Sequence, residues 1–426
     1  MNRLMKAFYG MFLVLSLNTY VMAEGVLRDS VGARSMGRGG TDIAFADNGV
    51  ILLDNPAGMV NIEGQGMADI GFDFLFTDLR CWDPDNTGVN GWDNPLPLPY
   101  LSLIRKSADE RWAFGLGVFA SSGMAADFDM AGPAPFLGTQ HYKTLGGLGK
   151  ILPGVSYALT DRLSIGGTFG LALSHIEMEG PYFLQSSGPF QGTPLKLSMY
   201  NTGVSPTWSA GLQYRFSDKT TIGLSYQSET FVNLEGNSRF EVPLLGTSDY
   251  DSHMRMIWPQ TAGIGIRHEI CPCRIISADV IWTGWWNAFN KFDLYFDNPS
   301  NPVFEAVIGP GLAEQFPLGW RDSISLRLGY EKHLDDYGII RLGYVYHRNP
   351  IPNETLTPYI PTTLVHAFSA GYGWMMKKSW EIDFAYQFAF GPDNNVAQSD
   401  FIGGDFDNSV YQVQAHWFSV SLMKKF

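Results

Sequence analysis

The sequence is poor in charged residues and cysteine, and it has no long apolar run beyond its N-terminus. Charged residues make up 17 % of the chain, whereas a soluble domain usually carries about 25 %. No later segment approaches the ~18 apolar residues of a transmembrane helix. The formal net charge of −13 argues against nucleic acid as a partner. Aromatic residues are frequent at 14 %, so the composition suits a protein whose outer wall faces lipid.

The three cysteines are too few for a disulfide framework. Cys81 falls in a predicted loop at one end of the fold, and Cys271-Pro272-Cys273 forms a predicted turn at the other end. A bridge within Cys-X-Cys would close only a strained ring. We therefore expect unpaired structural thiols, and we predict no metal site and no cofactor.

The N-terminus has the order of a secretory signal peptide. A short basic head at residues 1–6 precedes an apolar core at residues 7–17, and small residues at 21–23 offer a cleavage site. A buried N-terminal helix is the alternative interpretation. We predict a signal peptide over residues 1–23 and an exported mature chain.

Residues 32–60 form a glycine-rich stretch without lasting helical or strand periodicity, and the run Asn55-Pro56-Ala57-Gly58 lies within it. Such a segment ahead of a long β-chain can be a plug inside a barrel or merely a leader. A barrel of roughly fourteen strands would leave a lumen wide enough to leak. We therefore predict a plug over residues 24–64, which is about the length needed to close that lumen.

Nearly everything after the plug alternates like sheet. Phe384 and Tyr386, for example, flank the small Ala385 in a run with one large apolar face. In a soluble sandwich the apolar face is the core, whereas in a membrane barrel it faces lipid. Periodicity alone does not separate these two folds.

Connector lengths favour the barrel. Predicted tight turns alternate with long connectors, as in outer-membrane barrels with short periplasmic turns. The tight turns fall at residues 107–110, 160–162, 217–219, 271–273, 335–336 and 377–379, and the long connectors at 81–96, 123–146, 181–202, 232–252, 298–319, 349–360 and 391–410. The count gives roughly fourteen strands over residues 65–426, with both termini on the periplasmic side. The chain also ends on the aromatic Phe426.

Several ordered motifs resemble the FadL/TodX family of outer-membrane transporters for hydrophobic compounds. The resemblance rests on Asn55-Pro56-Ala57-Gly58, on the strand-like residues 112–119, on Asp279-Val280-Ile281-Trp282-Thr283-Gly284-Trp285, on Trp320-Arg321-Asp322 with residues 327–330, and on Thr357-Pro358 with Pro361. It implies a plugged barrel in the outer membrane and transport without covalent chemistry. Thr362-Thr363-Leu364 stands where the family often has an Asp-Arg pair, and Ser121-Ser122-Gly123 stands where it has proline. Ligand identity is therefore not carried over.

Two sets of residues are candidates for gating. Asn55, Pro56, Ala57 and Gly58 predict a rigid turn wedged against the wall, because proline fixes its φ and glycine permits close approach. An ordinary turn leading into the first strand is the alternative. Gly115, Gly117 and Gly123 make the third strand the expected place of a side opening, because interior glycine weakens a strand.

The predicted long loops are unusually apolar. Exposed apolar patches usually mark binding sites, so we expect these loops to capture ligand. The alternative is that the loops pack on one another as a lid, and both can hold. The candidate capture residues are Phe240, Leu244, Leu245, Phe304, Ile308 and Phe316.

The leading hypothesis is a passive outer-membrane transporter for hydrophobic molecules, such as fatty acids, aromatic hydrocarbons or detergents. Its ligand would leave past the plug or through a gap in the wall. A water-filled porin and a secreted β-sandwich are the alternatives. We expect no enzyme, because the eight histidines form no H-x-x-x-H pair. The expected partners are ligand, outer-membrane lipid and lipopolysaccharide, and we expect a monomer.

Overall fold

The computed structural model describes residues 26–426 except 93, 244, 335–337, 378 and 404–405. The predicted signal peptide at residues 1–23 and the first two residues of the predicted plug lie outside the described part of the chain. Among the described residues, no helix has the length and hydropathy needed to cross a membrane.

All strands belong to one sheet, which closes on itself because β1 pairs with β20. The strands are β1 (Gly66–Asp83), β2 (Asn86–Asn90), β3 (Leu96–Lys106), β4 (Trp112–Ala131), β5 (Thr139–Ala158), β6 (Leu163–Phe183), β7 (Pro194–Ser217), β8 (Thr220–Gln227), β9 (Thr230–Val242), β10 (Gly246–Trp258), β11 (Thr261–Cys271), β12 (Arg274–Thr283), β13 (Lys291–Asp297), β14 (Gly311–Pro317), β15 (Ser323–His333), β16 (Ile339–His347), β17 (His366–Lys377), β18 (Trp380–Phe390), β19 (Asn394–Val396) and β20 (Ser409–Lys425). Fourteen of these strands pair in a closed antiparallel ring, in the order β1, β3, β4, β5, β6, β7, β8, β11, β12, β15, β16, β17, β18 and β20. The other six, β2, β9, β10, β13, β14 and β19, add to this ring at one end of the barrel. The wall is thus a barrel of fourteen strands, and the predicted fold class is confirmed.

Strand alternation sets the two faces of the wall. Phe384 is 48 % exposed on the outside, whereas its neighbour Ala385 is 9 % exposed and faces inward. The same pattern runs along β1, where Phe72 points out and Asp73 points in. The outer face is apolar and the lumenal face carries polar groups, as expected for a barrel surrounded by lipid.

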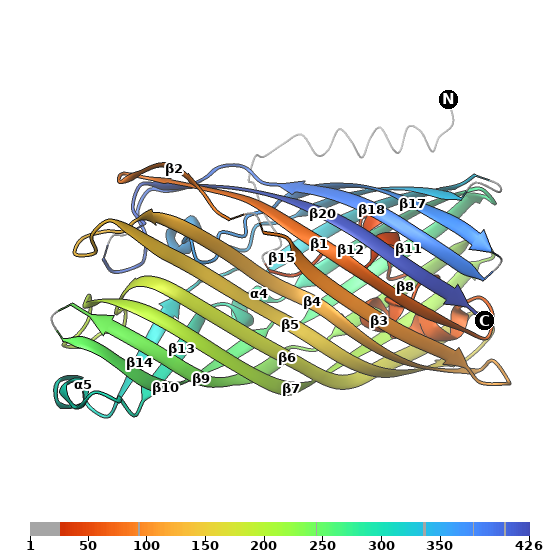
Figure 1. The fold of residues 1–426 in the computed structure, drawn as a ribbon. Coiled ribbons are helices and arrows are strands. Elements are labelled where there is room, and N and C mark those ends of the chain that lie inside the picture. Colours follow the sequence, from red (N-terminus) through yellow and green to blue (C-terminus); the bar gives the residue numbers. More distant parts are fainter. Residues whose placement is uncertain (1–25, 93, 244, 335–337, 378, 404–405) are drawn as a thin grey trace.

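The two ends of the barrel differ (Figure 1). At one end, which we call the turn end, short connectors such as residues 107–111 and 218–219 join the strands, and the C-terminus lies there. At the other end, which we call the loop end, several strands extend beyond the barrel's ring and longer connectors join them. Two segments predicted as long connectors, residues 123–146 and 232–252, are mostly strand, because β4 with β5 and β9 with β10 continue their pairing there. In both segments, buried residues alternate with more exposed ones. This alternation is the pattern of a strand, although the sequence prediction assigned these residues to loops.

The loop end holds an extensive apolar core. Inward side chains of the extended strands meet side chains from α4 (Trp285–Ala288), α5 (Pro302–Ile308) and the segment around η4 (Asn353–Thr355). Aromatic pairs join it, including Phe240 with Phe296 and Phe316 with Phe401. This core fills the lumen at the loop end of the barrel.

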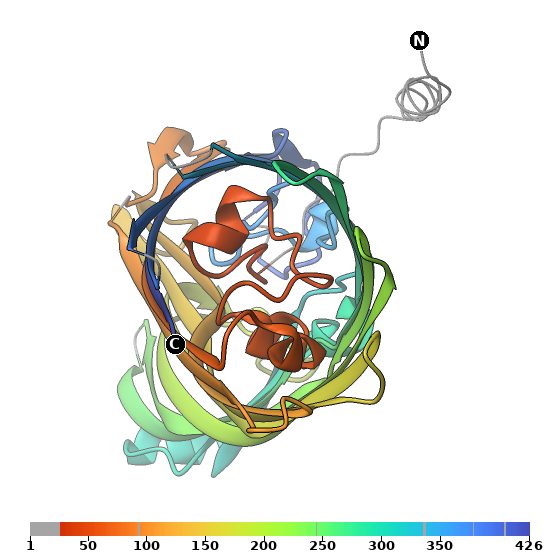
Figure 2. The same cartoon turned by 90° about the vertical axis from the view of Figure 1, so that its right-hand side faces the viewer.

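Residues 26–65 lie inside the barrel and close it from the turn end (Figure 2). They form α2 (Ala33–Gly37), α3 (Ile51–Asp54) and the 3₁₀ helix η2 (Pro56–Asn61), joined by irregular chain. We call residues 30–65 the plug and residues 26–29 the N-terminal strap. The glycine-rich stretch thus lies in the lumen, surrounded by the wall strands.

Candidate functional site

The Asn55 side chain fixes the plug to the wall. It is fully buried, donates to the carbonyl oxygens of Ile43 (2.7 Å) and Leu212 (3.2 Å), and accepts from the N–H of Ala57 (3.2 Å). Asn55 is also the N-cap of η2, with Pro56 at the first helical position, a position where proline is favoured. The Asn55 amide thus makes two hydrogen bonds within the plug and one to β7.

Two wall glycines make this docking possible. A Cβ on Gly211 would lie 1.9 Å from Asn55 Oδ1, and one on Gly166 would lie 2.6 Å from the backbone of Pro56 and Ala57. No other residue type leaves room for the plug chain at these two positions of β6 and β7. Asn55-Pro56-Ala57-Gly58 therefore packs closely against β6 and β7.

A buried network of charges holds the other side of the plug. Arg38 of the plug pairs with Glu331 of β15 (3.1 Å), and Arg34 pairs with Glu381 of β18. Arg341 of β16 bonds to the same Glu331 (2.9 Å). These arginines are at most 7 % exposed, so removing one partner would leave uncompensated buried charge.

Wall carboxylates also accept backbone N–H groups of the plug. Asp279 of β12 accepts from Asp42 (2.9 Å) and Ile43 (3.0 Å), and Asp69 of β1 accepts from Gly49 (2.9 Å). Charge-assisted bonds of this kind are about twice as strong as neutral ones. The plug is therefore anchored around its circumference.

On the turn side of the plug lies a polar vestibule of about 560 Å³. Its lining is dominated by charged and amide side chains, among them Arg34, Glu63, Arg162, Arg267, Glu269, His333 and Lys425. An apolar molecule entering this vestibule from the lumen would displace bound water from charged groups, which is unfavourable. The plug thus separates a polar space from the apolar lumen.

The wall is irregular at β4. This strand pairs with β3 only from Lys106↔Ala113 to Tyr100↔Phe119, and its pairing with β5 shifts register between Ala120 and Ser122. Directly beyond Phe119, the edge of β4 that faces β3 no longer pairs with β3. A bulge of this kind is a feature of functional positions in sheets.

The N-terminal strap covers this edge from inside the barrel. Leu27 forms an isolated antiparallel bridge with Ser122, and the N–H of Gly123 donates to the carbonyl of Val26 (3.0 Å). Arg28 pairs with Asp73 of β1 and donates to the carbonyl of Ala120 (2.7 Å). On the far wall, Asp29 pairs with His347 (2.7 Å).

Beside the strap lies an apolar cavity of about 370 Å³ in the wall. Its lining includes the lumenal side chains of Met124 and Leu148 and also Leu173, which is 41 % exposed on the outer face. Leu27 and Arg28 of the strap form part of the lining. The cavity beside β4 is thus lined by residues from the lumenal and the outer face of the wall, and the strap lies across it.

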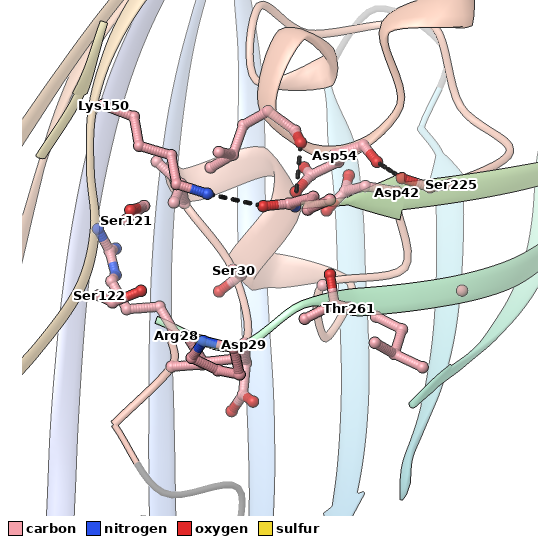
Figure 3. Close-up of a pocket in the computed structure, with 18 of the residues that line it drawn as sticks. Arg28, Asp29, Ser30, Asp42, Asp54, Ser121, Ser122, Lys150, Ser225 and Thr261 are labelled. Atoms are coloured by element: carbon pink, nitrogen blue, oxygen red, sulfur yellow. Dashed lines mark hydrogen bonds between the residues drawn. The ribbon is translucent and has the colours of Figure 1, made fainter. Parts of the chain in front are cut away.

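A smaller polar cavity of about 90 Å³ adjoins it between strap, plug and wall (Figure 3). The two cavities share Leu27, Arg28, Ser122 and Leu148. Lys150 of β5 points into the polar cavity, is 8 % exposed, and donates to the neutral amide oxygen of Gln227 (2.9 Å). Gln227 in turn donates to the carbonyl of Leu53 at the end of α3 (3.1 Å).

The glycines singled out on β4 do not lie together at the opening. Gly123 lines the apolar cavity and bonds to the strap. Gly115 and Gly117 lie in the regular part of β4 and face the plug, where a Cβ on Gly115 would be 2.8 Å from Leu52 and Met59. Their small size makes room for α3 and does not create the bend. The register shift falls at Ser121 instead.

The candidate capture residues are placed differently from the prediction. Phe240 lies on β9 and Phe316 on β14, so neither is a loop residue. Phe240, Phe304 and Phe316 are buried, and Leu245 and Ile308 pack against the same core. Leu244 lies outside the described residues. These residues pack inward because the extended strands give them an apolar interior, as in the lid alternative.

Sequence reasoning missed Arg28, Asp29 and Lys150. Lys150 follows an apolar and glycine-rich run, and the alternation of β5 puts it on the lumenal face. A cation at a lumenal position in a strand with few charges is a signal that could have marked it. The strap residues gave no local signal, because their partners Asp73 and His347 are distant in sequence.

A closed barrel with an internal plug and an apolar core at the loop end defines a plugged outer-membrane channel. Residues 14–426 match the family model described as outer membrane protein transport protein (OMPP1/FadL/TodX). The chain therefore belongs to this family. It is an outer-membrane transporter of hydrophobic compounds, and the porin alternative is set aside.

Known relatives are distant in sequence and similar in fold. A long-chain fatty acid transport protein of Salmonella typhi is 19 % identical over 381 residues, covering 83 % of this chain and 82 % of the relative. A Pseudomonas aeruginosa FadL homologue has a TM-score of 0.76 at 18 % identity, covering 95 % of this chain and 100 % of the other. The P. putida toluene transporter TodX also gives 0.76 at 18 % identity, with 93 % and 99 % covered.

Outer-membrane barrels have short turns on the periplasmic side and long loops outside. The turn end of this barrel accordingly faces the periplasm, and the loop end faces the medium.

Proposed function

We propose that hydrophobic ligand enters at the loop end, collects in the apolar cavity and leaves through the wall beside β4 when the strap moves. The observation that carries this proposal is the apolar cavity of about 370 Å³, which has lining residues on both faces of the wall and the strap across it. Burial contributes about 0.8 kcal/mol per methylene, so ten methylenes give about 8 kcal/mol. That is enough for micromolar capture without ionic contacts.

The alternative exit passes the plug, and the contacts around the plug weigh against it. Ligand moving that way would have to displace the Asn55 amide or the buried Arg38 network and then cross the charged vestibule. We propose that Asn55-Pro56-Ala57-Gly58 acts as the anchor of the plug, and that the moving part is the strap. The Gly123 region of β4 serves as the side opening, while Gly115 and Gly117 seat the plug.

The residues of the loop-end core are proposed to guide ligand inward. Phe240, Phe304 and Phe316 line the way as buried aromatic side chains, so capture requires that this core separates locally. Methionine is adaptable in such cores, and Met178, Met199 and Met254 line a small cavity within the loop-end core.

The ligand class is proposed from the two cavities together. The printed names of the relatives point to fatty acids and to toluene. A tail or ring fits the apolar cavity, and the Lys150 ammonium in the adjoining polar cavity offers a partner for a carboxylate head. A long-chain carboxylic acid uses both cavities, whereas a plain hydrocarbon uses only one.

We propose further that the chain works as a monomer in contact with outer-membrane lipid and lipopolysaccharide, and that it has no enzymatic activity. The proposed ligand path lies within one chain, which supports the monomer. Detergent molecules that resemble the ligand are expected to occupy the same cavities.

The experiment that tests this function fills the apolar cavity. Ala415 is 1 % exposed and lines it, so Ala415→Phe should abolish uptake of a labelled long-chain fatty acid by cells. The matched control is Ala370→Phe on the lipid-facing surface, which should transport normally. Both proteins need normal surface levels and heat-modifiable migration on gels. Normal uptake by the Ala415→Phe protein would overturn the proposed path.

A further inference from the structure

The three cysteines differ in their surroundings. Cys81 is fully buried within the loop-end core. Cys271 and Cys273 lie on the tight turn between β11 and β12, where Cys271 is half-buried and Cys273 is exposed. Only Cys81 fits the expected structural thiol, because the pair on the turn packs against no core.

The pair on the turn is held in close contact. The Sγ atoms of Cys271 and Cys273 are 2.9 Å apart. Pro272 between them fixes its own φ, and the pairing of Cys271 with Arg274 closes the turn. The two sulfur atoms therefore meet without any rearrangement of the wall strands.

The pair is also chemically unequal. The hydrogen bond from Cys273, the backbone N–H of Cys273 and the charge of Arg274 lower the pKa of the Cys271 thiol. The same hydrogen bond raises the pKa of the Cys273 thiol. A thiolate is the nucleophile in disulfide exchange, so Cys271 is suited to attack first and Cys273 to resolve.

The surroundings of the turn favour oxidation. The turn lies at the periplasmic end, and Pro272 lines the polar vestibule beneath the plug. The bacterial periplasm is kept oxidising, in contrast to the cytosol. Strained or exposed disulfides are the labile ones, so a bridge within this short turn could be reduced again by two external thiols, which become one disulfide.

We propose that Cys271-Pro272-Cys273 is a reversible thiol–disulfide site on the periplasmic face of the barrel, with a periplasmic or small-molecule disulfide as its oxidant. The Cys271 thiolate attacks one sulfur of the external disulfide, forms a mixed disulfide and releases the first thiolate. Cys273 loses its proton to solvent and attacks the Cys271 sulfur, which closes the Cys271–Cys273 bond and releases the second thiolate. Two thiols are oxidised by two electrons, and one external disulfide is reduced to two thiols.

The test uses the purified full-length protein in detergent and glutathione disulfide as the probe. After oxidation and alkylation, the peptide that holds both turn cysteines should carry no label and be lighter by two hydrogens than the reduced peptide. Cys81 is the internal reference and should label only after unfolding. Dithiothreitol should restore labelling of both turn cysteines.

Two single variants make the proposal falsifiable. The Cys273→Ser protein should trap glutathione on Cys271, and its labelling should persist to lower pH than that of Cys273 in the Cys271→Ser protein. Neither change touches the core, so folding should be unaffected. Three results with the unsubstituted protein would each overturn the proposal. They are full labelling of both turn cysteines after oxidation, glutathione retained on both of them, and a disulfide between two chains.

Discussion

The strap and the plug are consecutive in sequence, yet they are attached to the wall very differently. The plug has the Asn55 amide, several buried arginines and three wall carboxylates as anchors, distributed over both sides of the barrel. The strap has two ion pairs, one bridge and a few hydrogen bonds. Segments with few contacts open at lower free energy than segments with many. The comparison supports the proposal that the short strap, and not the plug, is the element that moves.

The largest effect on the barrel is expected when the plug is released from the wall. Arg38→Ala would leave Asp42, Asp47 and Glu331 without their shared cation, and losing one partner of a buried pair costs about 3–5 kcal/mol. We expect a leaky channel that conducts ions in planar bilayers. Arg239→Ala removes an ion pair in which both side chains are more than half exposed and should not conduct. A tight barrel in the Arg38→Ala protein would contradict the anchoring role.

A change in the polar cavity should alter which ligand is carried. Lys150→Met keeps the length of the side chain and removes the charge, and a hydrogen bond to a charged group contributes about 1.5–3 kcal/mol. Binding of a long-chain carboxylic acid should weaken by about tenfold or more. Binding of a hydrocarbon of the same length should be unchanged. Equal losses for both ligands, measured by calorimetry, would mean that Lys150 does not meet the head group.

Loss of the plug anchor should lower stability and leave the route intact. Asn55→Ala removes three hydrogen bonds of a buried side chain and leaves partners unsatisfied, at about 1–3 kcal/mol. Protease should reach the plug sooner, while uptake per folded molecule should stay near normal. Asn61→Ala, on the same helix η2 and bonded to Ser164 and Gln213, provides a comparison at an exposed residue. Blocked uptake with normal surface levels of Asn55→Ala would make the plug run the gate.

The smallest effect is expected at the far end of the strap. Asp29→Asn keeps the shape of the side chain but weakens its pairing with His347, because the charge is lost. We expect faster ligand release in a stopped-flow assay and little change in unfolding temperature. Slower release would show that the Asp29–His347 pair does not hold the strap closed.

Much of the fold could be predicted from the sequence because it depends on short-range patterns. The alternation around Ala385 predicts which side chains face lipid, and the structure places Phe384 outside. The run Asn55-Pro56-Ala57-Gly58 predicts a rigid turn against the wall, and the structure has Asn55 as the N-cap of η2 with Pro56, Ala57 and Gly58 in its first residues. Its partners Gly166 and Gly211 could not be predicted, because that contact depends on how far the plug penetrates the barrel.

The candidate site was predicted only in part, for the same physical reason. Interior glycine pointed to β4, but the strap that bridges β4 beside the register shift comes from Leu27, which the whole plug and β1 to β3 separate from Ser122 in the sequence. The apolar residues of the loop end were expected in loops. The sequence alone does not show which strand pairs with these segments, and without a partner strand their alternation does not predict that they extend the sheet. Phe240 and Phe316 proved to lie on strands.

The most direct test of the account compares two disulfide locks in a chain that carries Cys271→Ser and Cys273→Ser. Leu27→Cys with Ser122→Cys ties the strap to β4 at its bridge. Ala33→Cys with Ser421→Cys ties the plug to β20, where the Ala33 N–H lies 2.8 Å from Ser421 Oγ. The measurement is fatty-acid uptake before and after reduction. The account predicts that the strap lock blocks uptake until it is reduced and that the plug lock has no effect, whereas a block by the plug lock alone would contradict it.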